Sequence, residues 1–389
     1  MPEAVLARPS EDSSLSDEQQ DFAAAIRDFC ERECSGEKLE RLTDGFTEAH
    51  SDEIAEQMGE LGWYGLMIDE QYGGSGGSFT DVVLFIEEAM RGEAPIAAYP
   101  VTMILIGALN RFGTEEQKHD LLGRVAKGGN LSIAMSEPES GSDVASLKTS
   151  AKLEDGEYVL DGAKMWCSYA HRSSHTLIVC RTQRTDSPHE GMSMIWVPRE
   201  ADGFTITPIK TLGGEETNEL HLDGVRVPEA NLLGVEGQGW TQLMAGLNFE
   251  RATLAAASLG TAQRAFDVAL DYAKERRQFG RPIGSFQAIQ HKFAQLATDL
   301  IQARLLVRWV ARLTDENPDR VLAQEASMAK LATTELAKRC ALEGMQIMGG
   351  YGYASEYPME RLLRSAVVGT IYGGTSEIQK NIIAKTLGL

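Results

Sequence analysis

The chain is poor in cysteine, in positive charge and in long hydrophobic runs, and each scarcity excludes a class of protein. Its five cysteines, in 389 residues, are odd in number and scattered, which is typical of a reducing cytoplasm and not of a disulfide framework. The formal net charge of −20 disfavours binding to nucleic acid or to an anionic membrane, because both require a basic surface. The most apolar run, 101–109, is too short to span a bilayer, and the acidic N-terminal segment has no apolar signal core. We therefore expect a cytoplasmic protein with no membrane insertion.

Several common catalytic motifs are also missing. The sequence has no P-loop, no G-x-S-x-G, no C-x-x-C pair and no H-E-x-x-H, and its seven histidines are scattered. Cys30 and Cys34 are four residues apart on a helical pattern, but two buried thiols are a better interpretation than a metal site because no histidine or further cysteine is near. We expect no metal, so the chemistry lies outside these motifs or depends on an organic cofactor.

The order of patterns predicts a mainly α protein with a central antiparallel β domain. Helical spacing of apolar residues begins at Ser16 and returns over 52–61, 80–91, 101–112 and 115–126. Runs with strand character follow at 131–135, 157–160, 175–181, 192–197, 204–208 and 219–227, with no helix between them. Long helical patterns then occupy about 240–275, 285–313, 318–348 and 359–386. We predict four parts: a disordered tail (1–14), an N-terminal helical domain (15–129), a middle β domain (130–236) and a C-terminal helical bundle (237–389).

One helical stretch, 237–280, carries the most unusual charges. Between Gly237 and Gln263 the only charged residues are Glu250 and Arg251, and no proline interrupts the segment. Such a composition is typical of a helix buried on nearly all sides. Because a buried carboxylate and guanidinium are costly without a partner or a role, the pair is a candidate for catalysis and substrate binding, with a structural ion pair as the alternative.

Three other segments could approach a ligand. Residues 134–143 (AMSEPESGSD) are dense in hydroxyls and glycine, and could contact a ring edge or a phosphate or form a surface turn. In an extended strand Trp166 and Ser168 share a face, and could stack on and hydrogen-bond to a flat heterocycle, or be core and surface residues. The glycine turns 349–352 and 371–377 could cap helices or bring the backbone close to a ligand.

Taken together, these segments resemble the acyl-CoA dehydrogenase family over about residues 16–387. The motifs that carry the resemblance follow in family order: SEPESGSDVASLKTSA, KMWCSYA, LDGVRVPEANLLGVEGQGW, ERRQFGRPIGSFQAIQ, QIMGGYGYASEYPMERLLR and IYGGTSEIQKNIIAK. The resemblance implies an N-terminal helical domain, a β-barrel-like middle domain and a C-terminal four-helix bundle. It also implies one FAD per subunit and a homotetramer built as a dimer of dimers.

The resemblance assigns a role to individual residues. In one subunit it places against the flavin Met135, Ser136, Ser142, Trp166 and Ser168, the last where most relatives have threonine. From the neighbouring subunit it brings to the cofactor Arg276, Phe279, Gln287, Gln346 and Gly350. Near the pyrophosphate and adenosine it places Thr375 and Glu377, which stands where several relatives have glutamine. The residues it implies for substrate binding are Ser142, Arg251 and Tyr372.

One departure from the family pattern identifies the candidate base. Many members carry the base as the glutamate of an IYEGT motif, but here that position is Gly373. A second group, similar to isovaleryl-CoA and long-chain acyl-CoA dehydrogenases, carries it on the long helix before an arginine, which here is Glu250. A dry site raises the proton affinity of a carboxylate and suits it to act as a base near neutral pH. The resemblance also implies that the backbone N–H of Gly373 binds the thioester carbonyl.

The resulting prediction is FAD-dependent α,β-dehydrogenation of an acyl-CoA to the 2,3-enoyl-CoA, in fatty acid or branched acyl catabolism such as β-oxidation. Glu250 would take the α-proton while the β-hydride passes to flavin N5. The space left by Gly373 suggests a branched or bulky acyl group, and the family's usual electron acceptor is an electron-transfer flavoprotein. Two alternatives remain open: a flavin monooxygenase or oxidase on the same fold, and a non-catalytic subunit that completes the FAD sites of a heteromer. Arg251 could bind CoA or tune Glu250.

Overall fold

The computed structural model describes residues 15–318 and 320–389, so the predicted tail 1–14 lies outside the described residues. The chain divides into two compact units. The first unit comprises the described residues before Thr43, together with Ser78–Pro95 and Arg251–Leu389. The second unit comprises Thr43–Gly77 and Ile96–Glu250. Helices of the N-terminal third therefore belong to both units, and the division at 129 and 236 stays a prediction.

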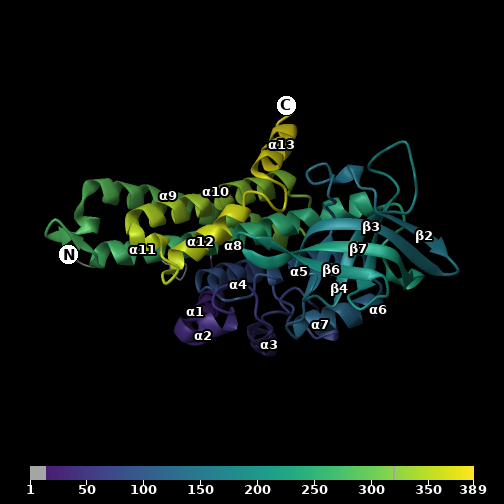
Figure 1. Cartoon of the computed structure of the whole chain (residues 1–389), viewed down its shortest axis with the longest axis horizontal. Helices are drawn as coiled ribbons and strands as arrows, with labels where there is room; N and C mark the ends of the chain where they lie inside the picture. Colours follow the sequence, from purple (N-terminus) through teal and green to yellow (C-terminus); the bar gives the residue numbers. More distant parts are fainter. Residues whose placement is uncertain (1–14, 319) are drawn as a thin grey trace. The chain divides into compact units, whose positions relative to one another are not determined.

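The first unit is helical (Figure 1). Its helices are α1 (Asp17–Glu33), α2 (Gly36–Leu42), α4 (Phe79–Arg91), α8 (Gly239–Glu275) from Arg251 onward, α9 (Gln287–Glu316), α10 (Ala323–Met348), α11 (Gly350–Tyr353), α12 (Pro358–Val368) and α13 (Ser376–Thr386). A two-stranded hairpin, β9 (Arg277–Gln278) and β10 (Arg281–Pro282), joins α8 to α9. Capping boxes at Ser16 and Ser78 begin α1 and α4, as the predicted start at Ser16 required.

A buried ion-pair cluster joins α4 to α9 in this unit. Glu87, on α4, accepts from Arg304 Nε at 2.9 Å and from Arg308 at 2.5 Å, and all three side chains are buried. Burial alone would raise the pKa of Glu87, but the two guanidinium groups outweigh it and hold this pKa below its usual value. The cluster is therefore charged at neutral pH and fixes the pairing of the two helices.

The second unit combines short helices with one sheet (Figure 1). Its helices are α3 (Asp52–Glu60), α5 (Tyr99–Phe112), α6 (Glu115–Gln117) and α7 (Gly123–Ala126), with a π-helical turn at Lys118–Leu122. The strands are β1 (Leu131–Ala134), β2 (Ser150–Glu154), β3 (Glu157–Ser168), β4 (His175–Arg181), β5 (Met192–Pro198), β6 (Phe204–Thr211), β7 (Gly214–Pro228) and β8 (Leu232–Leu233). The sheet follows the order β6-β7-β3-β2-β4-β5-β8, and β1 pairs with β4.

Most strand pairs are antiparallel, in agreement with the predicted β domain. The exceptions are β1 beside β4, with Leu131 opposite His175, and a single parallel pairing of β2 with β4. Side chains from β1 to β5 and β7 form a common buried core that includes Tyr158, Ile178 and Ile195. This core holds β1 and β3 together, and the loop that follows β1 carries the first group of predicted site residues.

Several short elements escaped the sequence patterns, among them β2 and α2. Strand β2 is mostly exposed beyond Ala151, so it shows no apolar alternation that spacing could detect. Helix α2 is only seven residues long and four of them are charged. None of the helices in the described ranges combines the length and hydropathy that a bilayer crossing requires.

Candidate functional site

The loop after β1 lies along β3 and is held there by a buried lysine. Lys164 is fully buried, and its Nζ donates to the carbonyl oxygen of Met135 at 3.0 Å and to Glu137 Oε1 at 2.8 Å. One residue further along β3, the N–H of Met165 donates to the carbonyl oxygen of Ser136 at 2.9 Å. The structure therefore brings Met135 and Ser136 beside the residues that precede Trp166.

The Lys164–Glu137 pair is charged, although it is buried. Burial alone would raise the pKa of Glu137, but Lys164 and the N–H groups of Thr149 and Lys148 outweigh it and hold this pKa below its usual value. Burial lowers the pKa of Lys164, and Glu137 opposes that shift only in part. The carboxylate thus binds two backbone N–H groups and the ammonium together, which fixes the loop that follows Met135.

Trp166 lies in a β-bulge on β3, where the register with β7 shifts between Lys164 and Cys167. Its φ is +62°, in the left-handed region that a bulky residue rarely adopts, and its side chain is 58% exposed. Simple alternation along β3 therefore does not fix the direction of Trp166, and the bulge does so instead. A strained backbone that holds a large aromatic side chain in the open is typical of a binding surface. Ser168 is half-buried, two residues further on.

Ser142 belongs to the same loop and is exposed. The loop is closed at its base by paired backbone hydrogen bonds between Glu137 and Ser140 and by the Ser140 hydroxyl, which donates to the carbonyl oxygen of Asp143 at 2.7 Å. Within the described residues the hydroxyl of Ser142 takes no part in this closure.

In the first unit, a glycine loop connects α12 to α13. Gly373 and Gly374 have φ values of +58° and +78°, which only glycine adopts without strain. The buried ammonium of Lys330, on α10, donates to the carbonyl oxygens of Gly369 at 2.8 Å and Gly374 at 2.9 Å. Gln379 Nε2, on α13, donates to the carbonyl oxygens of Gly373 and Gly374, each at 2.9 Å.

The peptide N–H groups of this loop have a different environment. Among residues 15–318 and 320–389, no hydrogen bond from the N–H of Gly373, Gly374 or Thr375 is present. The Thr375 side chain caps α13 by accepting from the N–H of Ile378 at 3.3 Å. Adjacent N–H groups before a capped helix suit an anionic or carbonyl oxygen. Tyr372 and Glu377 flank them, and both are exposed.

The five residues that, by the resemblance, contact the FAD of a neighbouring subunit lie in the first unit, and all are exposed. Phe279, in the β9–β10 turn, is 94% exposed with φ of +50°. Arg276 lies over the Tyr351 ring at 5.3 Å, which links the end of α8 to α11 beside Gly350. The other two, Gln287 and Gln346, begin α9 and lie near the end of α10, and both are exposed.

Glu250 and Arg251 lie in the driest part of α8. Their residues are 6% and 8% exposed, and every residue from 250 to 260 is buried, as the composition of the segment predicted. The division between the two units falls between these two residues. The carboxylate of Glu250 is therefore largely removed from solvent.

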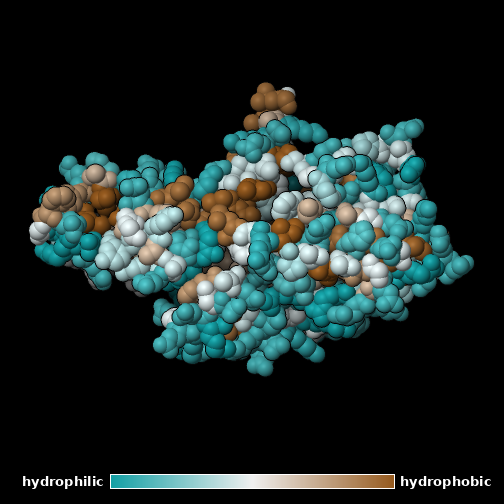
Figure 2. Space-filling model, viewed as in Figure 1, coloured by the Kyte–Doolittle hydropathy of each residue, from teal (hydrophilic) through white to brown (hydrophobic). Residues whose placement is uncertain are grey.

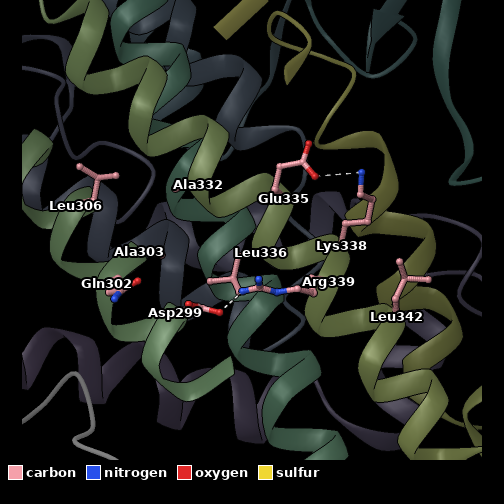
Figure 3. A pocket seen from close by; sticks show the side chains of 10 residues that line it. All are labelled: Asp299, Gln302, Ala303, Leu306, Ala332, Glu335, Leu336, Lys338, Arg339 and Leu342. Carbon is pink, nitrogen blue, oxygen red and sulfur yellow. Dashed lines mark hydrogen bonds and ion pairs between the residues drawn. The ribbon is translucent and has the colours of Figure 1, made fainter. Parts of the chain in front are cut away.

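Two other features were considered and carry no site. Cys30 and Cys34 are both buried, and their mutual hydrogen bond together with burial raises the pKa of Cys30 well above its usual value, so it is a poor nucleophile. A surface hollow of about 550 Å³ between α9 and α10 is shown in Figure 3. Its charges pair with each other, as in Glu335 with Lys338 and Arg339 with Asp299, and no predicted site residue lines it.

Each unit, taken by itself, offers a surface of a kind that a flavin nucleotide requires: an aromatic surface in the second unit and an anion-binding turn in the first. Trp166 offers an exposed ring, Ser136 and Ser168 offer hydroxyls, and the residues before α13 offer backbone N–H groups. Four residues that shape these surfaces were missed from sequence: Glu137, Lys164, Lys330 and Gln379. For Lys330 a signal existed, because helical spacing aligns it with Ala326, Thr333 and Ala337, all of which are buried.

Comparison with known proteins identifies the class. The family models of acyl-CoA dehydrogenases match in order: the N-terminal domain at residues 16–129, the middle domain at 132–225 and the C-terminal domain at 237–388. The chain therefore belongs to the acyl-CoA dehydrogenase family, which confirms the predicted family and its three-part fold. Members of this family are FAD-dependent oxidoreductases that dehydrogenate acyl-CoA thioesters, so FAD is the cofactor of this chain.

Individual relatives cover nearly the whole chain. An acyl-CoA dehydrogenase of Bacillus subtilis (strain 168) is 39% identical over 380 residues, which is 96% of this chain and 98% of the relative. A mitochondrial isovaleryl-CoA dehydrogenase of Oryza sativa subsp. japonica is 38% identical over 336 residues, covering 85% of this chain and 81% of the relative. The crystal structure of an acyl-CoA dehydrogenase from Geobacillus kaustophilus superposes with a TM-score of 0.90 at 33% identity, over 97% of this chain and all of that one.

Proposed function

We propose that this chain oxidises an acyl-CoA to the 2,3-enoyl-CoA with Glu250 as the base that removes the α-proton. The observation that carries this assignment is the buried carboxylate of Glu250 in a stretch of α8 where residues 250–260 are all buried. A glycine, Gly373, stands where many relatives carry their catalytic glutamate. A desolvated carboxylate has a raised proton affinity and suits proton abstraction near neutral pH.

The second unit supplies the surface for the isoalloxazine ring. Trp166 would stack on the ring, and the Ser168 hydroxyl would donate near N5, with Met135 and Ser136 at the ring edge. The bulge and the tether of Met165 to Ser136 hold these groups in place before the cofactor binds. When bound, FAD supplies the acceptor for the β-hydride. Ser142 would lie near both the cofactor and the thioester.

The glycine loop would bind the thioester carbonyl. The N–H of Gly373, which has no hydrogen bond within the described ranges, would donate to this oxygen and stabilise the negative charge that grows as Glu250 takes the proton. Tyr372 would line the acyl pocket. Arg251 would contact the CoA moiety or tune Glu250, and the two roles differ in whether Arg251 variants change substrate affinity or the pH profile.

Exposed apolar side chains in the first unit support an oligomer. Figure 2 shows apolar residues among hydrophilic ones on this surface. The large exposed apolar side chains of α9, α10 and α12 include Leu305, Trp309, Leu342 and Val368. Together with 94%-exposed Phe279, they support a homotetramer in which each subunit completes its neighbour's FAD site. A heteromer is the alternative that purification of the chain alone would reveal.

The electron acceptor in this proposal is an electron-transfer flavoprotein in the cytoplasm, and the acyl group is branched or bulky. A scan of acyl-CoA esters tests the activity: the purified yellow protein is mixed anaerobically with each ester, and flavin bleaching is followed. We expect bleaching and enoyl-CoA formation, faster with branched or bulky esters than with straight-chain ones. No bleaching with any ester would contradict the proposed activity and support a non-catalytic subunit. Rapid reoxidation in air with a hydroxylated product or abundant peroxide would instead support an oxidase or monooxygenase.

A further inference from the structure

Three carbonyl oxygens of the Gly369–Gly374 segment accept hydrogen bonds from side chains inside the helical unit. Lys330 Nζ holds those of Gly369 and Gly374, and Gln379 Nε2 holds those of Gly373 and Gly374. The Gly374 oxygen therefore accepts from both side chains. Both side chains are fully buried, so water does not compete for these hydrogen bonds.

The orientation of the Gln379 amide is fixed by the same contacts. A flipped amide would place its oxygen against two carbonyl oxygens, so Nε2 must face Gly373 and Gly374. Gln379 Oε1 is buried, and among the described residues it has no hydrogen-bond donor. The amide thus leaves its acceptor unsatisfied while both of its donations go to the loop. The amide therefore holds residues 373–374 although this orientation leaves a buried oxygen without a hydrogen bond, which is energetically unfavourable.

The backbone of Gly374 also lies very close to the side chain of Gln379. A Cβ atom added to Gly374 would lie 2.7 Å from Gln379 Nε2, and its φ of +78° already requires glycine. Two consecutive glycines with left-handed backbone can exchange between conformations by rotating the peptide that joins them. Rotation of the Gly373–Gly374 peptide would break the hydrogen bond of the Gly373 carbonyl to Gln379, turn the N–H of Gly374 and release the backbone of Gly373 from its fixed conformation.

We infer that Lys330 and Gln379 are positioning residues that fix the Gly373 N–H toward the thioester carbonyl and thereby set how readily the α-proton is lost. The inference rests on the proposed function, because it assigns the orientation of the donor which that function uses. The ammonium and the amide do not touch the substrate. They act through the backbone of the loop: because the carbonyls of Gly369, Gly373 and Gly374 are held, the turn keeps one conformation and the N–H of Gly373 keeps one position.

The test is Lys330→Met in the FAD-loaded protein, which keeps the chain length and removes the donors. The readout is the apparent pKa of the α-proton of a bound 3-thiaacyl-CoA, an analogue that can be deprotonated but not oxidised, followed by its long-wavelength absorbance. We expect this pKa to rise by about one unit or more, which corresponds to a loss of tenfold or more in carbanion formation. We expect the FAD content to stay unchanged, and hydrogen exchange of the peptide covering 369–376 to speed up.

Thr333→Val is the matched control, because Thr333 is buried on the same helix and its hydroxyl donates within α10, to the carbonyl oxygens of Ala329 and Lys330. It should leave the analogue's pKa unchanged. The inference is wrong if Lys330→Met does not shift this pKa, or if Thr333→Val shifts it equally. Should Lys330→Met fail to fold, Gln379→Met tests the same hydrogen bonds from α13 and must raise the pKa.

The proposed function has a separate failure signature. Glu250→Gln should abolish deprotonation of the analogue altogether, whatever the state of Lys330. If Glu250→Gln abolishes it and Lys330→Met leaves the pKa alone, the function stands and the positioning role falls. If the wild-type protein never deprotonates any acyl-CoA analogue, the proposed function itself is wrong.

Discussion

Two fully buried lysines each hold a loop that the account places at the active site, and they do so differently. Lys164, in the second unit, donates to the Met135 carbonyl and to the carboxylate of Glu137. Lys330, in the first unit, donates to the carbonyls of Gly369 and Gly374, and the amide of Gln379 supports it. The loop at Met135 is therefore held through a carboxylate of its own, and the glycine loop through its backbone carbonyls.

The difference separates stability from orientation. Removing one partner of a buried ion pair strongly destabilises the folded protein, because the other charge is left buried without compensation. Hydrogen bonds to backbone carbonyls contribute less each, but they determine which way a peptide faces. Changes at Lys164 should thus act mainly on folding, and changes around the glycine loop should act mainly on catalysis.

The largest expected effect on stability is that of Lys164→Met. Removal of the ammonium leaves Glu137 charged and buried, so the free energy of unfolding should fall by about 3–5 kcal/mol. Denaturant unfolding of the FAD-loaded protein measures it. The control is Lys152→Met, at an exposed position of β2, which should change stability by less than about 0.5 kcal/mol. Equal effects of the two variants would remove the contrast between the loops.

The double variant Lys164→Met/Glu137→Gln should be more stable than the sum of the single changes predicts. Each single change leaves one buried charge without its partner, whereas the double change removes both charges. We expect a coupling energy of about 1–3 kcal/mol in a double-mutant cycle. Strict additivity would show that the pair does not act as a unit.

A smaller effect on stability, with a clear effect on catalysis, is expected for Gly374→Ala. The left-handed backbone costs about 1–2 kcal/mol for any residue with a Cβ, and the added atom also displaces Gln379 Nε2. Gly156→Ala is the control, because Gly156 has φ of +83° with no atom within 4 Å of its added Cβ. Both variants should lose stability through the left-handed backbone, Gly374→Ala somewhat more because of the added contact, but only Gly374→Ala should slow flavin reduction. A slowing by both would trace the loss to general destabilisation.

The smallest expected effect is a shift in acid stability. Because the folded pKa of Glu137 is lowered, its contribution is present above the usual glutamate pKa of about 4.3 and is lost as pH falls through the lower folded value. Removing Lys164 removes the largest cause of that lowering, so Lys164→Met should move the acid unfolding midpoint to higher pH. Circular dichroism against pH measures it, and an unmoved midpoint would contradict the assigned cause.

Sequence patterns predicted the elements and the family well, but not the contacts that orient the loops. The dry stretch around Glu250 and the capped start at Ser16 follow from local composition, and both are found. The bulge at Trp166 depends on pairing with β7, which is distant in sequence, so alternation along β3 could not predict it. Gln379 likewise acquires its role only when α13 folds back on the glycines before it.

The central claim is that Glu250 removes the α-proton, and Glu250→Gln tests it most directly. The amide keeps the size of the side chain but cannot accept the proton. We expect FAD content to remain at the wild-type level and the rate of anaerobic flavin reduction by the best acyl-CoA to fall by about 10²–10⁴-fold. In the control variant Glu275→Gln, at an exposed position of the same helix, the acyl-CoA should reduce the flavin at the wild-type rate. Reduction of Glu250→Gln at the wild-type rate would contradict the account.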